Sequence, residues 1–499
     1  MKERLVSFVD QNKALFIFFS FLILAFIFFS PSYLNQNYFW DDERFIFLNP
    51  EVLQAPHWYS FWILKSEFIK SWPLGYSIFY ILMKYSPINS FNFYKSLNII
   101  FHALNAFLVY RLNKKLKFPY PFILSLIFLI HPLHVEVVSW IFQLLTILAM
   151  TFFLVSFLLL NNFLESKKYF PLVLSILFFL FSLWTKSIAL LTPFLFVLVF
   201  WLCKSRFKEY LFLIPYFLIS LYIGVFNIQG MKQIANQNST LNKTSSLRDK
   251  VFSSVENNFQ NIFENSKPVI KNTSEKVYFD FIYPKSETLF EHQPIKIFKQ
   301  ASWHYFTKLI FPTHMNFIYK DIDYGGFLTA IPIIILLIIP LFLLGIDKLI
   351  LFIPVMTLVF LVPYLGVTNI TFFYWSNVSD RYLYFFILVL IFSLGLLAKK
   401  YPVRKTKIII SFYCLALSAQ TINYGLKFNK PIELYKEIIT YRPHPVIYAA
   451  LISGYDLNLD LINGEKTLNE ALLKFPNDPL LTTEQFKLNN LKKYYLNNN

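Results

Sequence analysis

Acidic residues just past the first long apolar run have the chemistry of a general base. Asp41 and Asp42 directly follow Phe39 and Trp40. Aromatic residues mark the headgroup depth of a bilayer, and a carboxylate beside them is partly desolvated. Desolvation raises the pKa of a carboxyl group toward the range of a useful base. A solvated loop that merely ends the preceding helix is the alternative interpretation of the two aspartates.

A second group combines two imidazoles and a carboxylate in one short segment. His131, His134 and Glu136 stand at positions i, i+3 and i+5 of the sequence HPLHVE. Such a set can ligate a divalent metal or orient a polar substrate. A turn cap with histidines at the membrane interface is the alternative.

Three cationic residues are candidates for holding a phosphate group. Arg381 lies in Ser379–Tyr384 (SDRYLY), and a guanidinium can bind phosphate oxygens bidentately. Lys186 is alone in the short loop after Trp184, and Lys308 lies in the aromatic and basic stretch Ile295–Phe311. An Asp-Arg pair at a helix start, and a lysine that reaches up to the headgroups, are the alternatives for Arg381 and Lys186.

The composition predicts that these groups are carried by an all-α polytopic membrane protein. Of 499 residues, 56% are hydrophobic and 15% charged, against about 25% charged in a usual soluble protein. Apolar runs of about 17–22 residues recur, and a helical crossing needs about 20. This excludes a disordered chain, a disulfide scaffold and a soluble enzyme, and it disfavours an outer-membrane barrel, because only 11 glycines are available for turns. Cys203 and Cys414 suggest neither a disulfide nor a thiolate metal site.

About eleven transmembrane helices are expected. The first is a retained helix, because its apolar run is longer than a signal-peptide core and no cleavage site follows. Basic residues cluster in alternate loops, which places the N-terminus in the cytoplasm and accounts for the net charge of +17 without a nucleic-acid partner. All the candidate residues then face the opposite side of the membrane. The expected spans are 14–33, 93–112, 121–132, 141–161, 170–184, 188–203, 210–228, 327–345, 349–365, 382–398 and 407–426.

Two domains follow from this pattern. Residues 1–426 form the transmembrane domain, with extracytoplasmic loops 34–92 and 229–326, and residues 427–499 form an extracytoplasmic helical tail. Pro73–Tyr85 is amphipathic but only about 13 residues long, which favours an interfacial helix. In the tail, Pro443 and Pro476 are 33 residues apart, close to the roughly 34-residue tetratricopeptide period. The tail is therefore interpreted as a small repeat remnant or docking arm.

Five segments of the chain follow one another in an order known from one protein family: Trp40–Pro50 (WDDERFIFLNP), Phe101–Arg111 (FHALNAFLVYR), His131–Ile141 (HPLHVEVVSWI), Trp303–Pro312 (WHYFTKLIFP) and Ser379–Tyr384 (SDRYLY). In these segments the chain resembles the GT-C class of polyprenyl-phosphate-sugar-dependent glycosyltransferases, most of all the transmembrane and tetratricopeptide-repeat-containing O-mannosyltransferases and their bacterial relatives. It differs from them in three places: at Phe142–Thr146 (FQLLT), where charged residues are usual; at Ser187, where Lys186 is usually followed by glutamate; and at Trp72, where an arginine is common before Pro73.

The resemblance implies a GT-C-like bundle and an inverting transfer of a hexose such as mannose. The donor would be a polyprenyl-phosphate sugar, and the acceptor a hydroxyl of a protein, lipid or glycan. Asp41 or Asp42 would be the base, Arg381 with Lys186 or Lys308 would stabilise the leaving phosphate, and His131, His134 and Glu136 would line the substrate site. This scheme needs no cofactor, although the His-His-Glu set leaves a divalent metal open. The composition, rich in Lys, Asn, Ile and Phe, suggests a bacterial inner membrane with the site facing the periplasm.

Two other functions stay open. A lipid-linked saccharide flippase or transporter would be expected to carry ionisable groups mid-membrane and inverted repeats, and the sequence has almost none of the first and no sign of the second. A scaffold that docks partners through its tail would leave the ordered extracytoplasmic motifs without a purpose.

Overall fold

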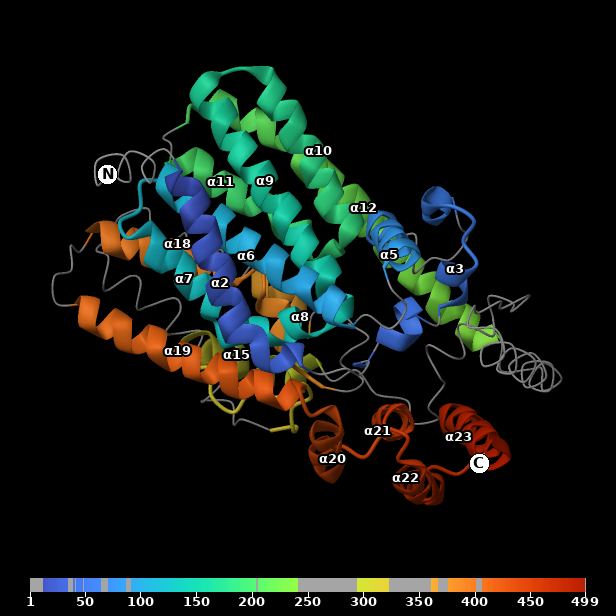
Figure 1. Ribbon diagram of the computed structural model, residues 1–499. Coiled ribbons are helices and arrows are strands. Elements are labelled where there is room, and N and C mark those ends of the chain that lie inside the picture. Colours follow the sequence, from blue (N-terminus) through green and yellow to red (C-terminus); the bar gives the residue numbers. More distant parts are fainter. Residues whose placement is uncertain are drawn as a thin grey trace. The chain divides into compact units, whose positions relative to one another are not determined.

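The computed structural model describes most of the chain. The described residues are 12–34, 39–40, 42–47, 49–63, 71–86, 91–202, 205–240, 294–322, 360–366, 376–400 and 406–498. Every regular element within these ranges is a helix (Figure 1).

The chain divides into two compact units, each described here by itself. Unit 1 comprises Met1–Leu34, Asn92–Val225 and His292–Asn429, and unit 2 comprises Asn35–Phe91, Phe226–Glu291 and Lys430–Asn499. The division near Lys430 lies close to the boundary expected at residue 426. Unit 2 also takes in residues 35–91, which the sequence assigned to the transmembrane domain.

The longer helices of unit 1 follow the apolar runs of the sequence. Short 3-10 turns join several of them, at Pro132–His134, Ile141–Gln143, Ser187–Leu191, Phe207–Leu213, Val362–Tyr364 and Asp380–Leu383. The α-helices are α2 (Lys13–Tyr33), α6 (Phe91–Lys115), α7 (Pro121–Ile130), α8 (Val135–Ser139), α9 (Leu144–Ser166), α10 (Tyr169–Thr185), α11 (Pro193–Leu202), α12 (Ile214–Thr240, which runs on into unit 2), α15 (Pro294–Ile310), α18 (Ile387–Lys400) and α19 (Thr406–Phe428).

Among the described residues, three helical stretches are long and apolar enough to cross a membrane. They are Lys13–Tyr33, Ile141–Ser166 and Phe207–Gln229. The pair Pro121–Ile130 and Pro132–Ser139 passes as a fourth if it is one broken span, and three shorter helices are also apolar. The expected span 327–345 and most of the expected span 349–365 lie outside the described residues, so the expected total of about eleven stays a prediction.

Helices α9 and α10 show how apolar helices are held together in unit 1 (Figure 1). Lys167 ends α9 with a left-handed backbone (φ +56°), which turns the chain back on itself. Ser156 and Ser175 each donate a hydrogen bond to the other's backbone carbonyl, at 2.7 Å, and Ser182 donates to the carbonyl of Ala149. Small polar side chains allow close approach and satisfy one another where the surroundings are apolar.

The break between α7 and α8 shapes the region of interest. The residue before a proline is pushed toward extended backbone, and His131, before Pro132, has φ −71° and ψ +127°. The helical stretches on either side of it are bent by 50° relative to each other. The bend brings His131, His134 and Glu136 into a short, buried segment.

Unit 2 contains two described helical groups. The first consists of a π-helix (Glu43–Phe47), α3 (Pro50–Leu53), a 3-10 helix (Trp58–Trp62) and α5 (Pro73–Tyr85), and its core includes Val52, Phe61 and Tyr76. Helix α5 has the bounds expected from the sequence. The second group is the tail, with α20 (Pro431–Tyr441), α21 (Pro445–Leu457), α22 (Leu461–Lys474) and α23 (Pro479–Asn498), coloured orange to red in Figure 1. Its core includes Tyr448, Ile452, Leu468, Ala471, Leu481 and Leu488.

Candidate functional site

Glu136 and Arg381 form a buried ion pair in unit 1. The guanidinium Nη1 of Arg381 lies 2.5 Å from Glu136 Oε1, and the Glu136 side chain is completely buried. Glu136 also accepts hydrogen bonds from the backbone N–H of Arg381 and from the hydroxyl of Ser379. The α8 carboxylate therefore fixes both the side chain and the backbone at the start of the 3-10 helix Asp380–Leu383.

Aromatic rings complete the surroundings of Arg381. Its guanidinium carbon lies 5.2 Å from the ring centre of Trp140 and 5.0 Å from that of Tyr382. Both distances are within the range of a cation–π contact. The cation is thus held by a carboxylate and two aromatic faces.

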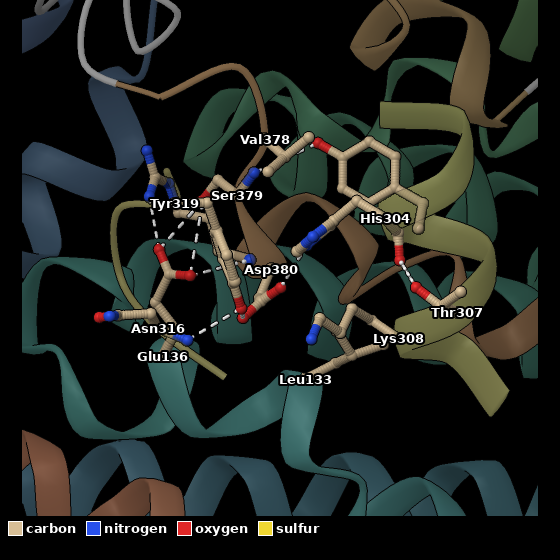
Figure 2. Close-up of polar contacts among 12 residues, drawn as sticks. Leu133, Glu136, His304, Thr307, Lys308, Asn316, Tyr319, Val378, Ser379 and Asp380 are labelled. Atoms are coloured by element: carbon tan, nitrogen blue, oxygen red, sulfur yellow. Dashed lines mark hydrogen bonds and ion pairs between the residues drawn. The ribbon is translucent and has the colours of Figure 1, made fainter. Parts of the chain in front are cut away.

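Asp380, the neighbour of Arg381, faces a different set of partners. His304 Nε2 lies 3.0 Å from Asp380 Oδ1, and the hydroxyl of Tyr319 donates to Oδ2 at 2.7 Å. Tyr319 accepts in turn from the backbone N–H of Asn316. Figure 2 shows Asp380 between Tyr319 and His304, with dashed lines from Glu136 toward Ser379. Burial lowers the pKa of His304 and outweighs the opposing effect of Asp380. A neutral His304 therefore donates from Nε2 to the carboxylate.

Lys308 lies one helical turn after His304 on α15. Its ammonium group donates to the backbone carbonyls of Thr313 and His314, and it lies 5.7 Å from the ring centre of Tyr319. Burial lowers the pKa of Lys308, whereas Asp380 raises it. The lysine stabilises the C-terminal end of α15 and adds a cation beside Asp380.

The two predicted histidines are buried but differ in their partners. Nε2 of His131 contacts the carbonyl of Leu309 at 3.1 Å, and Nδ1 accepts from the backbone N–H of Leu133. The ring of His134 packs among those of His102, Phe128 and Tyr384. No group of three His, Cys, Asp or Glu side chains among the described residues is arranged to hold a metal ion. Because both ring nitrogens of His131 are engaged, the arrangement does not favour the metal interpretation of this segment.

Lys186 contacts a different set of side chains in unit 1. Its ammonium group donates to Gln143 Oε1 at 2.9 Å and to Thr146 Oγ1 at 2.8 Å, and it lies 5.5 Å from the ring centre of Phe142. These partners belong to Phe142–Thr146, one of the three places where the sequence departs from the family it resembles. Neutral oxygen ligands hold Lys186 there.

The acidic segment after α2 belongs to unit 2. Asp41 lies outside the described residues. Asp42 is 1% exposed, and its Oδ2 accepts from the backbone N–H of Phe39 at 3.1 Å, while its own N–H donates to the carbonyl of Phe39. These two hydrogen bonds between Phe39 and Asp42 close a short loop.

Four segments far apart in the sequence meet through polar contacts in unit 1. His102 Nδ1 lies 2.9 Å from the hydroxyl of Tyr384, His131 contacts the α15 carbonyl of Leu309, Glu136 pairs with Arg381, and His304 pairs with Asp380. These contacts connect Phe101–Arg111, His131–Ile141, Trp303–Pro312 and Ser379–Tyr384.

Sequence reasoning assigned no role to His304 or Tyr319, and for Asp380 it offered only a local pair with Arg381. His304 and Asp380 lie inside two of the segments that carry the resemblance, which was the available signal. Tyr319 carried none, because its role depends on a partner 61 residues away.

Comparison of the chain with protein-family models, with curated proteins and with solved structures finds no match. The resemblance rests on the five sequence segments themselves.

Proposed function

We propose that this protein is an integral-membrane glycosyltransferase. It would transfer a sugar from a polyprenyl-phosphate donor to a hydroxyl acceptor at the outer face of a membrane. One observation carries the proposal: four of the five segments on which the resemblance rests contact one another through buried polar side chains. Buried charges are costly unless they are paired, so their concentration in one place favours a functional site over a general packing motif.

The cations of this cluster are suited to a leaving phosphate. Phosphate is already a fair leaving group, so catalysis needs positive charge near the oxygen that leaves rather than a proton donor. Arg381 is the first candidate, and the Glu136 carboxylate holds its guanidinium in one orientation. Lys308 and Lys186 are the other candidate donor contacts, with His131 and His134 lining the same region as Arg381.

Asp41 is the favoured base. Its neighbour Asp42 is buried, and Oδ2 of Asp42 accepts the hydrogen bond from Phe39 that closes the loop. This contact supports a structural role for Asp42 and leaves the chemistry to Asp41. In the proposed step, Asp41 takes the hydroxyl proton of the acceptor while the acceptor oxygen bonds to the anomeric carbon. The bond from that carbon to the phosphate oxygen breaks, and the anomeric configuration inverts. No cofactor takes part.

The finer architecture belongs to the same proposal. The bundle would have about eleven spans in a bacterial inner membrane, with the tail and the loops 34–92 and 229–326 on the periplasmic side. The membrane location follows from the donor. Its lipid tail stays in the bilayer, so the active site must bind the sugar phosphate at headgroup depth.

We further infer that α21, α22 and the start of α23 form one tetratricopeptide repeat. The starts of α21 and α23 are 34 residues apart, and α21 packs against both α22 and α23, as the first helix of such a repeat does. Most positions of the repeat pattern correspond to Tyr448, Leu451, Tyr455, Gly464, Leu468, Ala471 and Pro476, whereas Ile452 stands where the pattern has glycine.

Release of polyprenyl phosphate tests the function. The purified protein in lipid nanodiscs is incubated with radiolabelled polyprenyl-phosphate hexoses and candidate hydroxyl acceptors. We expect transfer by the wild type, loss of at least 100-fold in kcat/KM for Asp41→Asn, and a similar loss for Arg381→Ala. Lys167→Ala, which changes a largely exposed ion pair of unit 1, should transfer normally.

Three results would contradict this proposal. Full activity of Asp41→Asn would remove the assigned base, and unchanged donor kinetics of Arg381→Ala would remove the phosphate contact. Movement of the sugar lipid across vesicles without any transfer would favour the flippase.

A further inference from the structure

A tyrosine of the tail holds the loop that carries the acidic residues. Within unit 2, the backbone N–H of Trp40 donates to the hydroxyl of Tyr435 on α20, at 3.1 Å. The ring of Tyr435 stacks on Phe39 with centres 5.9 Å apart and an interplanar angle of 17°, and it also contacts the ring of Trp40. One side chain therefore binds the loop by a hydrogen bond and by two aromatic contacts.

The loop has a backbone conformation that needs such support. Trp40 has φ +50°, in the left-handed region that bulky residues rarely occupy. Such a conformation is strained, and it persists only where its surroundings fix it. The carboxylate of Asp42 closes the loop from within through Phe39, and Tyr435 binds the amide of Trp40 from outside. Described residues on both sides of Asp41 are thus fixed by named contacts.

Tyr435 is itself part of a packed element. It is 2% exposed, and its helix neighbours Leu434 and Ile438 are also buried. Helix α20 packs against α21, where Gly454 brings the two helices so close that an added Cβ would lie 3.3 Å from Ile432. The tyrosine is therefore presented by a helix that is anchored in the folded tail.

We propose that Tyr435 is a positioning residue, through which the tail holds the backbone at Phe39 and Trp40, the residues that precede the proposed base in the sequence. This inference rests on the proposed function and gives the tail a role in catalysis. A displacement of about 1 Å in a catalytic group can cost on the order of 100-fold in rate, so a loop held from outside matters to turnover. Because Tyr435 acts through the backbone of the loop, its loss is expected to lower kcat and to leave donor affinity unchanged.

The test separates the hydrogen bond of Tyr435 from its packing. Tyr435→Phe keeps the ring stacked on Phe39 and removes only the hydroxyl. The matched control is Tyr448→Phe, because Tyr448 is an equally buried tail tyrosine whose hydroxyl binds Glu470 and Lys474 instead of the loop. Two quantities are measured in nanodiscs: hydrogen exchange of the Trp40 amide, and kcat and KM for sugar transfer.

We expect Tyr435→Phe to speed exchange of the Trp40 amide by about 2- to 10-fold, the change that corresponds to one hydrogen bond of ordinary net strength. We also expect kcat to fall about tenfold with donor KM unchanged. Tyr448→Phe should match the wild type in both measurements, and Tyr435→Ala, which also loses the stacking, should show larger changes than Tyr435→Phe.

The outcomes distinguish the two proposals. Unchanged exchange at Trp40 in Tyr435→Phe overturns the positioning role whatever the activity. Faster exchange with wild-type kcat overturns the catalytic part of the inference. A wild type that transfers no sugar, with exchange still faster in Tyr435→Phe, overturns the proposed function and the catalytic role together while the contact itself stands.

Discussion

Glu136 and Arg381 are each costly to bury without the other. Removing one partner of a buried pair typically costs about 3–5 kcal/mol, because the remaining charge is left uncompensated. We therefore expect Glu136→Gln and Arg381→Met each to lower the free energy of unfolding by about 3 kcal/mol. The double variant should lose clearly less than the sum, because neither charge is then stranded. A double-mutant cycle on thermal or denaturant unfolding in detergent measures this coupling.

An exposed pair provides the comparison for this cycle. The Lys167 and Glu209 side chains also form a short ion pair, but they are 57% and 20% exposed. Their coupling should be below about 1 kcal/mol, as for most surface pairs. Equal coupling in the two cycles would mean that the Glu136–Arg381 contact is not the buried pair described above.

The contacts of single residues show what the sequence could and could not predict. Glu136 and Arg381 were singled out by residue type and by the resemblance, and the structure brings them into contact across 245 positions. Nothing in their spacing specifies that contact. The Asp380–His304 pair was not foreseen, because aspartate beside arginine suggested a local pair, whereas Asp380 turns to α15 and Arg381 turns to α8.

At the scale of elements, apolar pattern and proline placement were sufficient for several helices. Pro73 at the first helical position and the amphipathic stretch after it define α5, and α2 differs by one residue from the span expected at its start. The sequence predicted a turn at His131 between the spans 121–132 and 141–161, and the structure bends there. Hydropathy carries no information on direction, so the 50° angle of this bend could not be predicted. Side-chain contacts such as that of Glu136 with Arg381 determine which residues the bent segment packs against.

Helix α21 begins at the N-cap residue His444, whose imidazole must be neutral to accept the cap hydrogen bond. His444 Nδ1 accepts from the backbone N–H of Val446, and a protonated Nδ1 has no lone pair for this bond. Burial, with a smaller effect of Arg442, lowers the pKa of His444 to about 4. Between pH 6.5 and about 4 the unfolded tail binds more protons than the folded one, so stability falls as the pH drops.

This cap predicts that the stability of the first turn of α21 depends on pH, and that replacing His444 by asparagine removes this dependence. Hydrogen exchange of the first-turn amides should speed markedly from pH 7.5 to pH 5, after correction for intrinsic rates, corresponding to about 2 kcal/mol. His444→Asn keeps a side-chain acceptor without a titrating group, so its corrected exchange should be nearly independent of pH. A wild-type first turn equally protected at both pH values would show that the cap does not titrate as expected.

Alanine substitutions at two helical glycines of unit 1 should have opposite effects on stability. A Cβ on Gly395 of α18 would lie 2.5 Å from a ring carbon of Phe118, whereas a Cβ on Gly224 of α12 would find its nearest neighbours, the Leu190 methyls, at 3.9 Å. Gly395→Ala should destabilise by about 1–3 kcal/mol through overpacking. Gly224→Ala should be neutral or stabilise by up to about 1 kcal/mol, because alanine has the higher helix propensity.

Unfolding midpoints of the two glycine variants in detergent measure this difference. Phe118→Leu should restore part of the stability lost in Gly395→Ala, because it removes the ring that the new methyl group meets. A Gly395→Ala variant as stable as the wild type would mean that α18 does not pack against Phe118 as described.

At the scale of the whole molecule, the proposal requires the tail and the basic segment Arg206–Lys208 before α12 to face opposite sides of the membrane. Lys208 lies at the start of the 3-10 helix Phe207–Leu213 and Glu433 lies on α20 of the tail, and both side chains are exposed. In a Cys203→Ser/Cys414→Ser background, Glu433→Cys in intact spheroplasts should react with a membrane-impermeant maleimide. Lys208→Cys should react only after lysis, because loops rich in Lys and Arg stay in the cytoplasm. Protection of Glu433→Cys in intact spheroplasts would put the Tyr435 helix, and the loop that it binds, on the side where a periplasmic acceptor never arrives, and the glycosyltransferase proposal would fail together with the role of the tail.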